Sequence, residues 1–192
     1  MENTIVELKF SLDTFYFLMS GVLVMWMAAG FAMLEAGLVR AKNTTEILTK
    51  NVALFSIACT MFLLVGYNIM YVDNAEGGFI PSFGALIGTQ AADADHSLES
   101  DFFFQVVFVA TAMSIVSGAV AERMKLWAFL IFTVILTGFI YPIEGYWTWG
   151  AGFLSEMGFV DFAGSAIVHG AGAAAALAGV LFLGARKGKY GK

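Results

Sequence analysis

The chain has 192 residues, of which 59% are hydrophobic and 13% charged, and its mean hydropathy is +0.80. Soluble domains carry about 25% charged residues, so this composition excludes an ordinary soluble protein and indicates a polytopic membrane protein. The formal net charge is −5, but the acidic and basic residues are separated along the chain, so the charge does not indicate a nucleic-acid partner, and we expect none.

Five stretches are long and apolar enough to cross a bilayer, which requires about 20 residues in an α-helix. The sequence therefore predicts an all-α membrane protein with five transmembrane helices. In chain order, the predicted spans are Phe15–Leu38, Val52–Val72, Phe102–Ala121, Leu126–Tyr146 and Phe162–Ala185.

The basic residues predict the orientation of these spans. Nine of the ten lysines and arginines lie between spans one and two, between spans three and four, or after span five. The intervening segments carry acidic residues and no lysine or arginine, so the positive-inside rule places the N-terminus outside and the C-terminus inside. Glu144 and Glu156 are assigned to an outside loop, Lys50 is assigned to an inside loop, and short secondary structure is expected around Pro81–Ile87.

An odd number of spans is typical of one half of an inverted-repeat transporter, in which the substrate route lies between two halves of opposite orientation. We therefore expect residues 1–192 to be a single five-helix repeat. A cell-membrane location, either plasma membrane or bacterial inner membrane, follows from the predicted spans.

One predicted span contains a histidine, His169, eight residues after Asp161. An ionisable side chain inside a membrane span is costly and often marks a conduction pathway. A regular helix beginning near Asp161 would place His169 about 12 Å along the axis. Asp161 can cap that helix by accepting backbone N–H bonds, and it could also help to hold a cation.

Aromatic residues gather near the predicted outer surface. Phe104 and Phe108 are four residues apart and so share a helix face, where they could pack in the core, face lipid or form a hydrophobic gate. Trp149 could belong to an interfacial aromatic belt or bind a small cation through its ring. Near the inner surface, Glu35 is expected to be paired or to snorkel, and Glu122 with Arg123 to mark the end of span three.

No cluster of cysteine and histidine suggests a metal site, and no phosphate-binding loop or nucleophile–base pair suggests an enzyme. We therefore expect no catalytic residues, no metal and no cofactor. His96 is interpreted as an ordinary surface histidine.

Five strings resemble the ammonium transporter family, which belongs to one superfamily with the Rhesus proteins. They occur in order along nearly the whole chain: Gly37-Leu-Val-Arg40-Ala-Lys42-Asn43, then Phe104-Gln105-Val-Val-Phe108 with Gly118-Ala-Val-Ala-Glu122-Arg123, and then Trp149-Gly150 with Asp161-Phe-Ala-Gly-Ser-Ala-Ile-Val-His169. The resemblance implies two inverted five-helix halves in a complete protein, of which this chain resembles the first. The chain is expected to be a fragment, or a half-size protein that pairs with another chain.

The resemblance also implies roles for particular residues. Phe108, with Phe104, is similar to the external gate of the family, and Trp149 to the tryptophan that holds ammonium by cation–π contact. Asp161 is similar to the aspartate that supports recruitment and deprotonation, and His169 to the first of two pore histidines that pass ammonia and a proton separately.

For the complete protein, the resemblance implies transport of ammonium or ammonia by a homotrimer in contact with membrane lipid and with a PII-type regulatory protein. An ammonium sensor that uses the same vestibule and a Rhesus-like gas channel are the alternatives. Trp149 argues against the gas channel, because that branch generally lacks the vestibule tryptophan. We expect these 192 residues not to conduct on their own.

Overall fold

The computed structural model describes residues 2–188, and all the regular secondary structure in that range is helical. Five helical stretches are long and apolar enough to span a membrane, as the sequence predicts. The first two stretches consist of α1 (Glu2–Leu38), η1 (Ala41–Asn43), α2 (Thr44–Met61), η2 (Phe62–Gly66) and α3 (Tyr67–Tyr71). The remaining stretches consist of α4 (Leu98–Val120), α5 (Leu126–Ile135), η3 (Leu136–Ile140), α6 (Tyr141–Thr148), α7 (Phe153–Glu156), η4 (Ser165–Gly170) and α8 (Ala171–Leu183).

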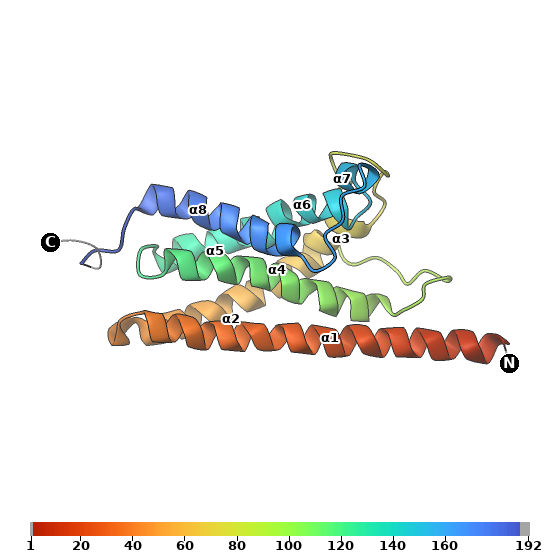
Figure 1. Cartoon of the computed structure of the whole chain (residues 1–192), viewed down its shortest axis with the longest axis horizontal. Helices are drawn as coiled ribbons and strands as arrows, with labels where there is room; N and C mark the ends of the chain where they lie inside the picture. The colour runs from red at the N-terminus through yellow and green to blue at the C-terminus, as the bar shows by residue number, and fades with distance from the viewer. Residues whose placement is uncertain (1, 189–192) are drawn as a thin grey trace.

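The helices lie roughly side by side, and the start of α1 and the end of α8 lie at opposite ends of the bundle (Figure 1). This arrangement is what an odd number of crossings requires. Which end faces the cytoplasm stays a prediction from the basic residues.

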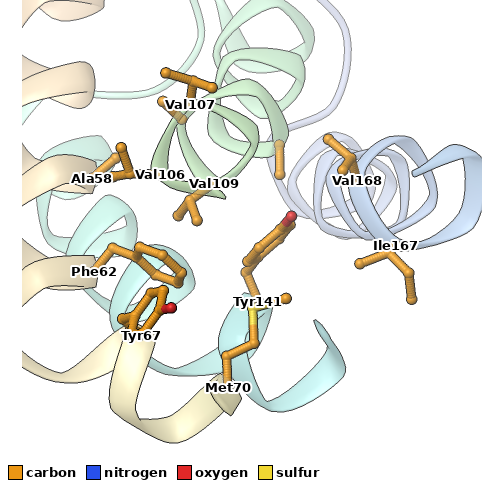
Figure 2. Packing of buried hydrophobic residues seen from close by; sticks show 12 residues of the cluster. Ala58, Phe62, Tyr67, Met70, Val106, Val107, Val109, Tyr141, Ile167 and Val168 are labelled. Atoms are coloured by element: carbon orange, nitrogen blue, oxygen red, sulfur yellow. The ribbon is translucent and has the colours of Figure 1, made fainter. Parts of the chain in front are cut away.

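α4 is the central helix. It packs against α1, α2 and α8, and its most apolar 18-residue stretch is 61% buried, whereas the corresponding stretch of α1 is only 6% buried. The main hydrophobic core gathers side chains from α2, η2, α3, α4, α6 and η4, with Tyr141 between Met70 and Val168 (Figure 2).

Three of the five stretches contain a π-helical turn, which the sequence did not indicate. Pro142 explains the turn at η3, because proline lacks an N–H and its ring clashes with the carbonyl four residues earlier, here that of Gly138. η3 packs against η2, where a Cβ on Gly66 would lie 3.0 Å from Pro142 Cγ and 3.2 Å from the Thr137 carbonyl oxygen. Glycine at this position therefore allows the two helices to approach closely.

The helices extend beyond the apolar stretches at several ends. α2 begins at Thr44, eight residues before the predicted Val52, while the fifth stretch begins at Ser165, three residues after the predicted Phe162. The predicted bounds differ because they were set by the length of each apolar stretch. A helix can continue through polar residues as long as its backbone hydrogen bonds continue. The expected short element at Pro81–Ile87 is wrong, since these residues form no helix or strand. They are held instead by bonds such as that from Leu86 N–H to the Leu64 carbonyl, 2.9 Å.

A buried ion pair ties α1, α2 and α4 together. Lys50 Nζ lies 2.6 Å from Glu35 Oε1 and also donates to the Ser117 carbonyl oxygen at 3.1 Å. Asn51 and the Ser117 hydroxyl donate to the same carboxylate, each at 2.8 Å to Oε2. The expectation of a paired Glu35 is confirmed, whereas the placement of Lys50 in a loop is wrong, because Lys50 lies within α2 and is 6% exposed.

A second set of charged residues lies at the same end of the bundle. It joins the segment after α1, the α4–α5 connection and the segment after α8. Glu122, in the α4–α5 connection, accepts bonds from the Arg40 backbone N–H at 2.9 Å, from Arg40 Nε at 3.0 Å and from Asn43. Arg186, after α8, lies 3.6 Å from the same carboxylate. Led by the Arg40 backbone N–H, these contacts lower the pKa of Glu122 to about 2, so its charge is retained. We call this end, with Glu35, Lys50, Arg40, Glu122 and Arg186, the charged end.

Candidate functional site

A row of aromatic rings lies at the opposite end of the bundle. Phe17 on α1 meets Phe104 on α4 edge-to-face at 5.2 Å between ring centroids, and Phe104 meets Phe108 at 5.0 Å. Phe108 in turn meets Trp149, one residue beyond α6, at 6.5 Å. The helical spacing therefore does place Phe104 and Phe108 on one face, and all four rings are half-buried.

The Trp149 side chain is fixed by a hydrogen bond as well as by packing. Its indole Nε1–H donates to the main-chain carbonyl oxygen of Asp161 at 2.7 Å. This bond connects the end of α6 to the segment that leads into the fifth helical stretch. It leaves the indole ring beside Phe108 with its orientation set.

The Asp161 carboxylate is occupied by backbone donors. Oδ1 accepts from the N–H groups of Gly164 at 3.0 Å and Ser165 at 2.9 Å, and Oδ2 accepts from Ala166 and Ile167, each at 2.8 Å. These are the unpaired N–H groups at a helix start, so the capping role expected from the sequence is confirmed.

This capping sets the electrostatics of Asp161. Burial alone would raise its pKa, but the four backbone N–H donors outweigh that effect and lower the pKa below its ordinary value of 3.8. A carboxylate has about four lone-pair positions, and four donors already use them. Asp161 is thus a charged group that orients the backbone around it.

Gly164 turns the chain into η4. Its φ of +82° lies in the left-handed region, where glycine is favoured. A Cβ there would lie 3.3 Å from Trp149 Cη2 and 2.6 Å from Val168 Cγ2. The residue therefore combines a tight turn with close contact to the tryptophan ring.

His169 lies nearer to the start of its helix than the sequence suggested. The helical stretch begins at Ser165, so His169 is four residues inside it, about 6 Å at an α-helical rise, and the expected 12 Å is wrong. Its backbone N–H donates to the Gly164 carbonyl oxygen at 3.1 Å. His169 is consequently tied by one backbone bond to the glycine that contacts Trp149.

The His169 side chain is exposed, while its neighbours Ile167 and Val168 are buried. Figure 2 shows these two neighbours on the same side of the core as Tyr141. Because Ile167 and Val168 anchor the π-helical turn, the imidazole is left outside this five-helix unit. A single five-helix repeat therefore leaves this histidine exposed rather than enclosed between its helices.

Sequence reasoning missed a row of polar side chains on α6. Tyr141, Glu144 and Thr148 are spaced three and four residues apart, so they share one helix face. Within residues 2–188, Tyr141 Oη, Glu144 Oε2 and Thr148 Oγ1 are buried without a hydrogen-bond partner. The assignment of Glu144 to an outside loop is wrong, since it lies in α6, and an acidic residue flanked by apolar ones was the available signal.

Among the described residues, no group of three or more His, Cys, Asp and Glu side chains is placed to hold a metal ion. The site therefore consists of aromatic rings, a carboxylate engaged by the backbone, and an exposed imidazole. Such an arrangement can offer a ring face to a small cation and a titratable nitrogen beyond it.

Comparison with known proteins supports the family suggested by the sequence. The model of the Ammonium Transporter Family matches residues 15–192. Ammonium transporter Amt2 of Archaeoglobus fulgidus is 41% identical over 188 residues, which cover 93% of this chain and 40% of the relative. Ammonium transporter Amt2 of Haloferax mediterranei is 44% identical over 171 residues, covering 88% of this chain and 38% of the relative.

Solved structures agree with the sequence relatives. A sensor Amt protein superposes with a TM-score of 0.89 at 32% identity, covering all of this chain and 48% of that one. Mep2 of Candida albicans superposes with a TM-score of 0.80 at 27% identity, covering 94% of this chain and 41% of that one. The chain spans less than half the length of these relatives, and its five apolar helices make it a multi-pass membrane protein. On this evidence, the chain belongs to the ammonium transporter family.

Proposed function

We propose that residues 1–192 form the first five-helix repeat of an ammonium transporter and supply one wall of its conduction pathway. The observation that carries this proposal is the continuous contact from Phe104 through Phe108 to Trp149, and from Trp149 through Asp161 and Gly164 to His169. A second repeat, from the same chain or from another, would complete the pathway on the exposed side of His169.

In this proposal the cation is recruited by the aromatic rings. The Trp149 face can attract ammonium with about 0.5–2 kcal/mol, and more as water is excluded. Phe104 and Phe108 close the path beyond it as a hydrophobic gate. Asp161 contributes indirectly, because its four backbone bonds hold the carbonyl that fixes the indole and its negative charge favours a nearby cation.

His169 would then accept the proton that ammonium loses. An imidazole titrates near neutral pH and can release the proton again, so ammonia and the proton can move separately. Ammonium and potassium have similar size, but potassium has no proton to lose. A pathway that requires deprotonation therefore excludes potassium.

Uptake of radiolabelled methylammonium by transport-deficient cells tests the proposal. Two proteins are compared at equal membrane expression: this chain alone, and this chain joined to the second half of the Archaeoglobus relative. We expect uptake only from the joined protein, with no competition by potassium. Uptake by the chain alone, or none from a correctly assembled joined protein, would contradict the proposal.

A sensor is the second candidate, because a sensor Amt protein is among the structural neighbours. The same aromatic site would then bind ammonium without passing it through the membrane. Binding of ammonium to the joined protein, measured by tryptophan fluorescence, in the absence of methylammonium uptake would select the sensor. The homotrimer and the PII-type partner implied by the resemblance remain predictions for the complete protein.

A further inference from the structure

A groove with a volume of about 630 Å³ lies between α8 and the helices α4, α5 and α6. Among the described residues that line it, Glu144 of α6 alone carries a charged group, and the other walls are apolar. We propose that a helix of the second repeat lies in this groove and donates a hydrogen bond to Glu144. This inference rests on the proposed function, because it requires the repeat that completes the pathway.

The wall that α8 contributes to the groove consists of small residues. They are Ala171, Ala174, Ala175, Ala178 and Gly179, and because they recur at spacings of three and four they share one face of the helix. Ala174 and Ala178 are exposed. Interfaces between membrane helices are enriched in such residues, because small side chains let two backbones approach closely. The shape of this wall therefore fits an α-helix.

Glu144 lacks a hydrogen-bond partner in the described part of the chain. Its Oε2 is buried and accepts no bond within residues 2–188. Tyr141 and Thr148 share its helix face, but each has a buried hydroxyl oxygen that is also without a partner, so neither supplies the bond. A buried carboxyl group without a partner is costly, and inside membranes such groups pair with other polar groups. A hydroxyl, amide or basic side chain on a covering helix would satisfy it.

The groove lies on the other side of α8 from the candidate conduction pathway. Ala171 follows His169 by two residues, which corresponds to a rotation of about 200° around a helix. Between these two faces, α8 exposes Leu177 and Leu181, which are 60% and 76% accessible. A second repeat that covers α8 from His169 to the groove would bury all of these surfaces.

A helix suits the groove better than a lipid chain does. An acyl chain can cover the apolar walls, but it carries no donor for Glu144. In Figure 1, α8 lies along one side of the bundle, so a further helix can reach it from outside. The chain spans 40% of the Archaeoglobus relative, so a protein of that length has ample sequence for another helix of about 20 residues.

Modification by dicyclohexylcarbodiimide tests this inference, because this apolar reagent reaches carboxyl groups from the lipid phase. The chain alone and the joined protein are treated in phosphatidylcholine vesicles, and the modified residue is located by mass spectrometry. We expect Glu144 to be modified in the chain alone and about tenfold more slowly in the joined protein, where a packed helix excludes the reagent. Glu144→Gln should remove the modification, whereas Glu35, which is paired with Lys50, should stay unmodified in both proteins.

A larger side chain in the groove provides a second measurement. Ala178 is exposed in the chain alone, so Ala178→Leu should change the thermal unfolding of that chain little. In the joined protein, the same substitution should lower the midpoint of unfolding by about 3 °C, because the leucine would meet the covering helix. Ala128→Leu is the matched control, since Ala128 is an exposed residue of α5 that does not line the groove.

Equal modification of Glu144 in both proteins, or none in the chain alone, would overturn the inference; the first result would leave lipid as the occupant. Modification of the chain alone that falls as its concentration in the membrane rises would overturn it in favour of a second copy of this chain. Methylammonium uptake by the same joined protein is measured in parallel. Uptake without protection of Glu144 contradicts only the docking in the groove, and protection without uptake contradicts only the proposed function.

Discussion

The two ends of this helical bundle satisfy their charged groups in different ways. At the charged end, Glu35 and Glu122 are held by lysine, arginine and asparagine side chains from other segments. At the aromatic end, the Asp161 carboxylate is held, among residues 2–188, by backbone N–H groups of its own segment. At the charged end, side chains bind the carboxylates and thereby join helices. At the aromatic end, backbone N–H groups bind the carboxylate, so nearby side chains are available to contact a ligand.

We interpret this difference as a division between a structural end and the end at which we propose function. Side-chain ion pairs across three segments fix where α1, α2 and α4 lie with respect to each other. A backbone-capped aspartate shapes a local turn and leaves the Trp149 ring and the His169 imidazole uncommitted by side-chain ion pairs in residues 2–188.

Breaking the buried ion pair should have the largest effect on stability. Lys50→Met leaves Glu35 buried without its cation, and such changes cost on the order of 3–5 kcal/mol. The free energy of unfolding, measured by denaturing-detergent titration with circular dichroism, checks this.

The double variant Glu35→Leu/Lys50→Met should cost less than Lys50→Met alone, because no unpaired charge then remains buried. Lys125→Met is a control that removes an exposed lysine at the same end, with an expected change within about 0.5 kcal/mol. If Lys125→Met lowered the free energy of unfolding as much as Lys50→Met, the loss could not be attributed to the buried ion pair.

Removing the Asp161 cap should destabilise the chain by about 2 kcal/mol, near the upper end for helix caps, because four donors lose their acceptor. Asp161→Ala should also release the loop that holds Trp149, so the joined protein should lose methylammonium uptake. Asp161→Asn keeps only one oxygen and should fall between. Full uptake by Asp161→Ala would contradict the positioning role.

A pair of glycine substitutions can isolate the contact with Trp149. Gly164 and Gly158 both have positive φ, at +82° and +80°, but a Cβ meets Trp149 and Val168 only at Gly164. Each alanine variant should lose about 1–2 kcal/mol from backbone strain. Gly164→Ala should lose about 1 kcal/mol more and shift the tryptophan fluorescence. Identical losses would mean that the close contact has no energetic effect.

The pH dependence of the charged end should be the smallest effect. The folded-state pKa of Glu122 is about 2, below its ordinary value of 4.5. Its contribution to stability is therefore fully present above about pH 5 and is lost as the pH falls from 4.5 toward 2. Glu122→Gln should flatten the unfolding free energy in that window. If the free energy of unfolding of this variant still fell between pH 4.5 and 2 as in the unsubstituted chain, other carboxylates would account for the pH dependence.

The sequence predicted the number of spanning helices and the shared face of Phe104 and Phe108, because bilayer length and helical spacing leave direct signals. It did not predict the π-helical turn that brings His169 near the helix start, since Gly164 and the following small residues are also typical of ordinary close packing. It also missed the burial of Lys50, because its partners Glu35 and Ser117 come from other helices. Contacts between distant segments have no local signature.

We propose that the aromatic end binds ammonium and that His169 lies in the conduction path. The chain has two histidines, and His96 stacks on Phe17 at 4.3 Å in the loop before α4, so it provides a matched control. We predict that His169→Ala abolishes methylammonium uptake by the joined protein or makes it sensitive to potassium, while His96→Ala leaves it unchanged. Normal, potassium-insensitive uptake by His169→Ala would contradict this account.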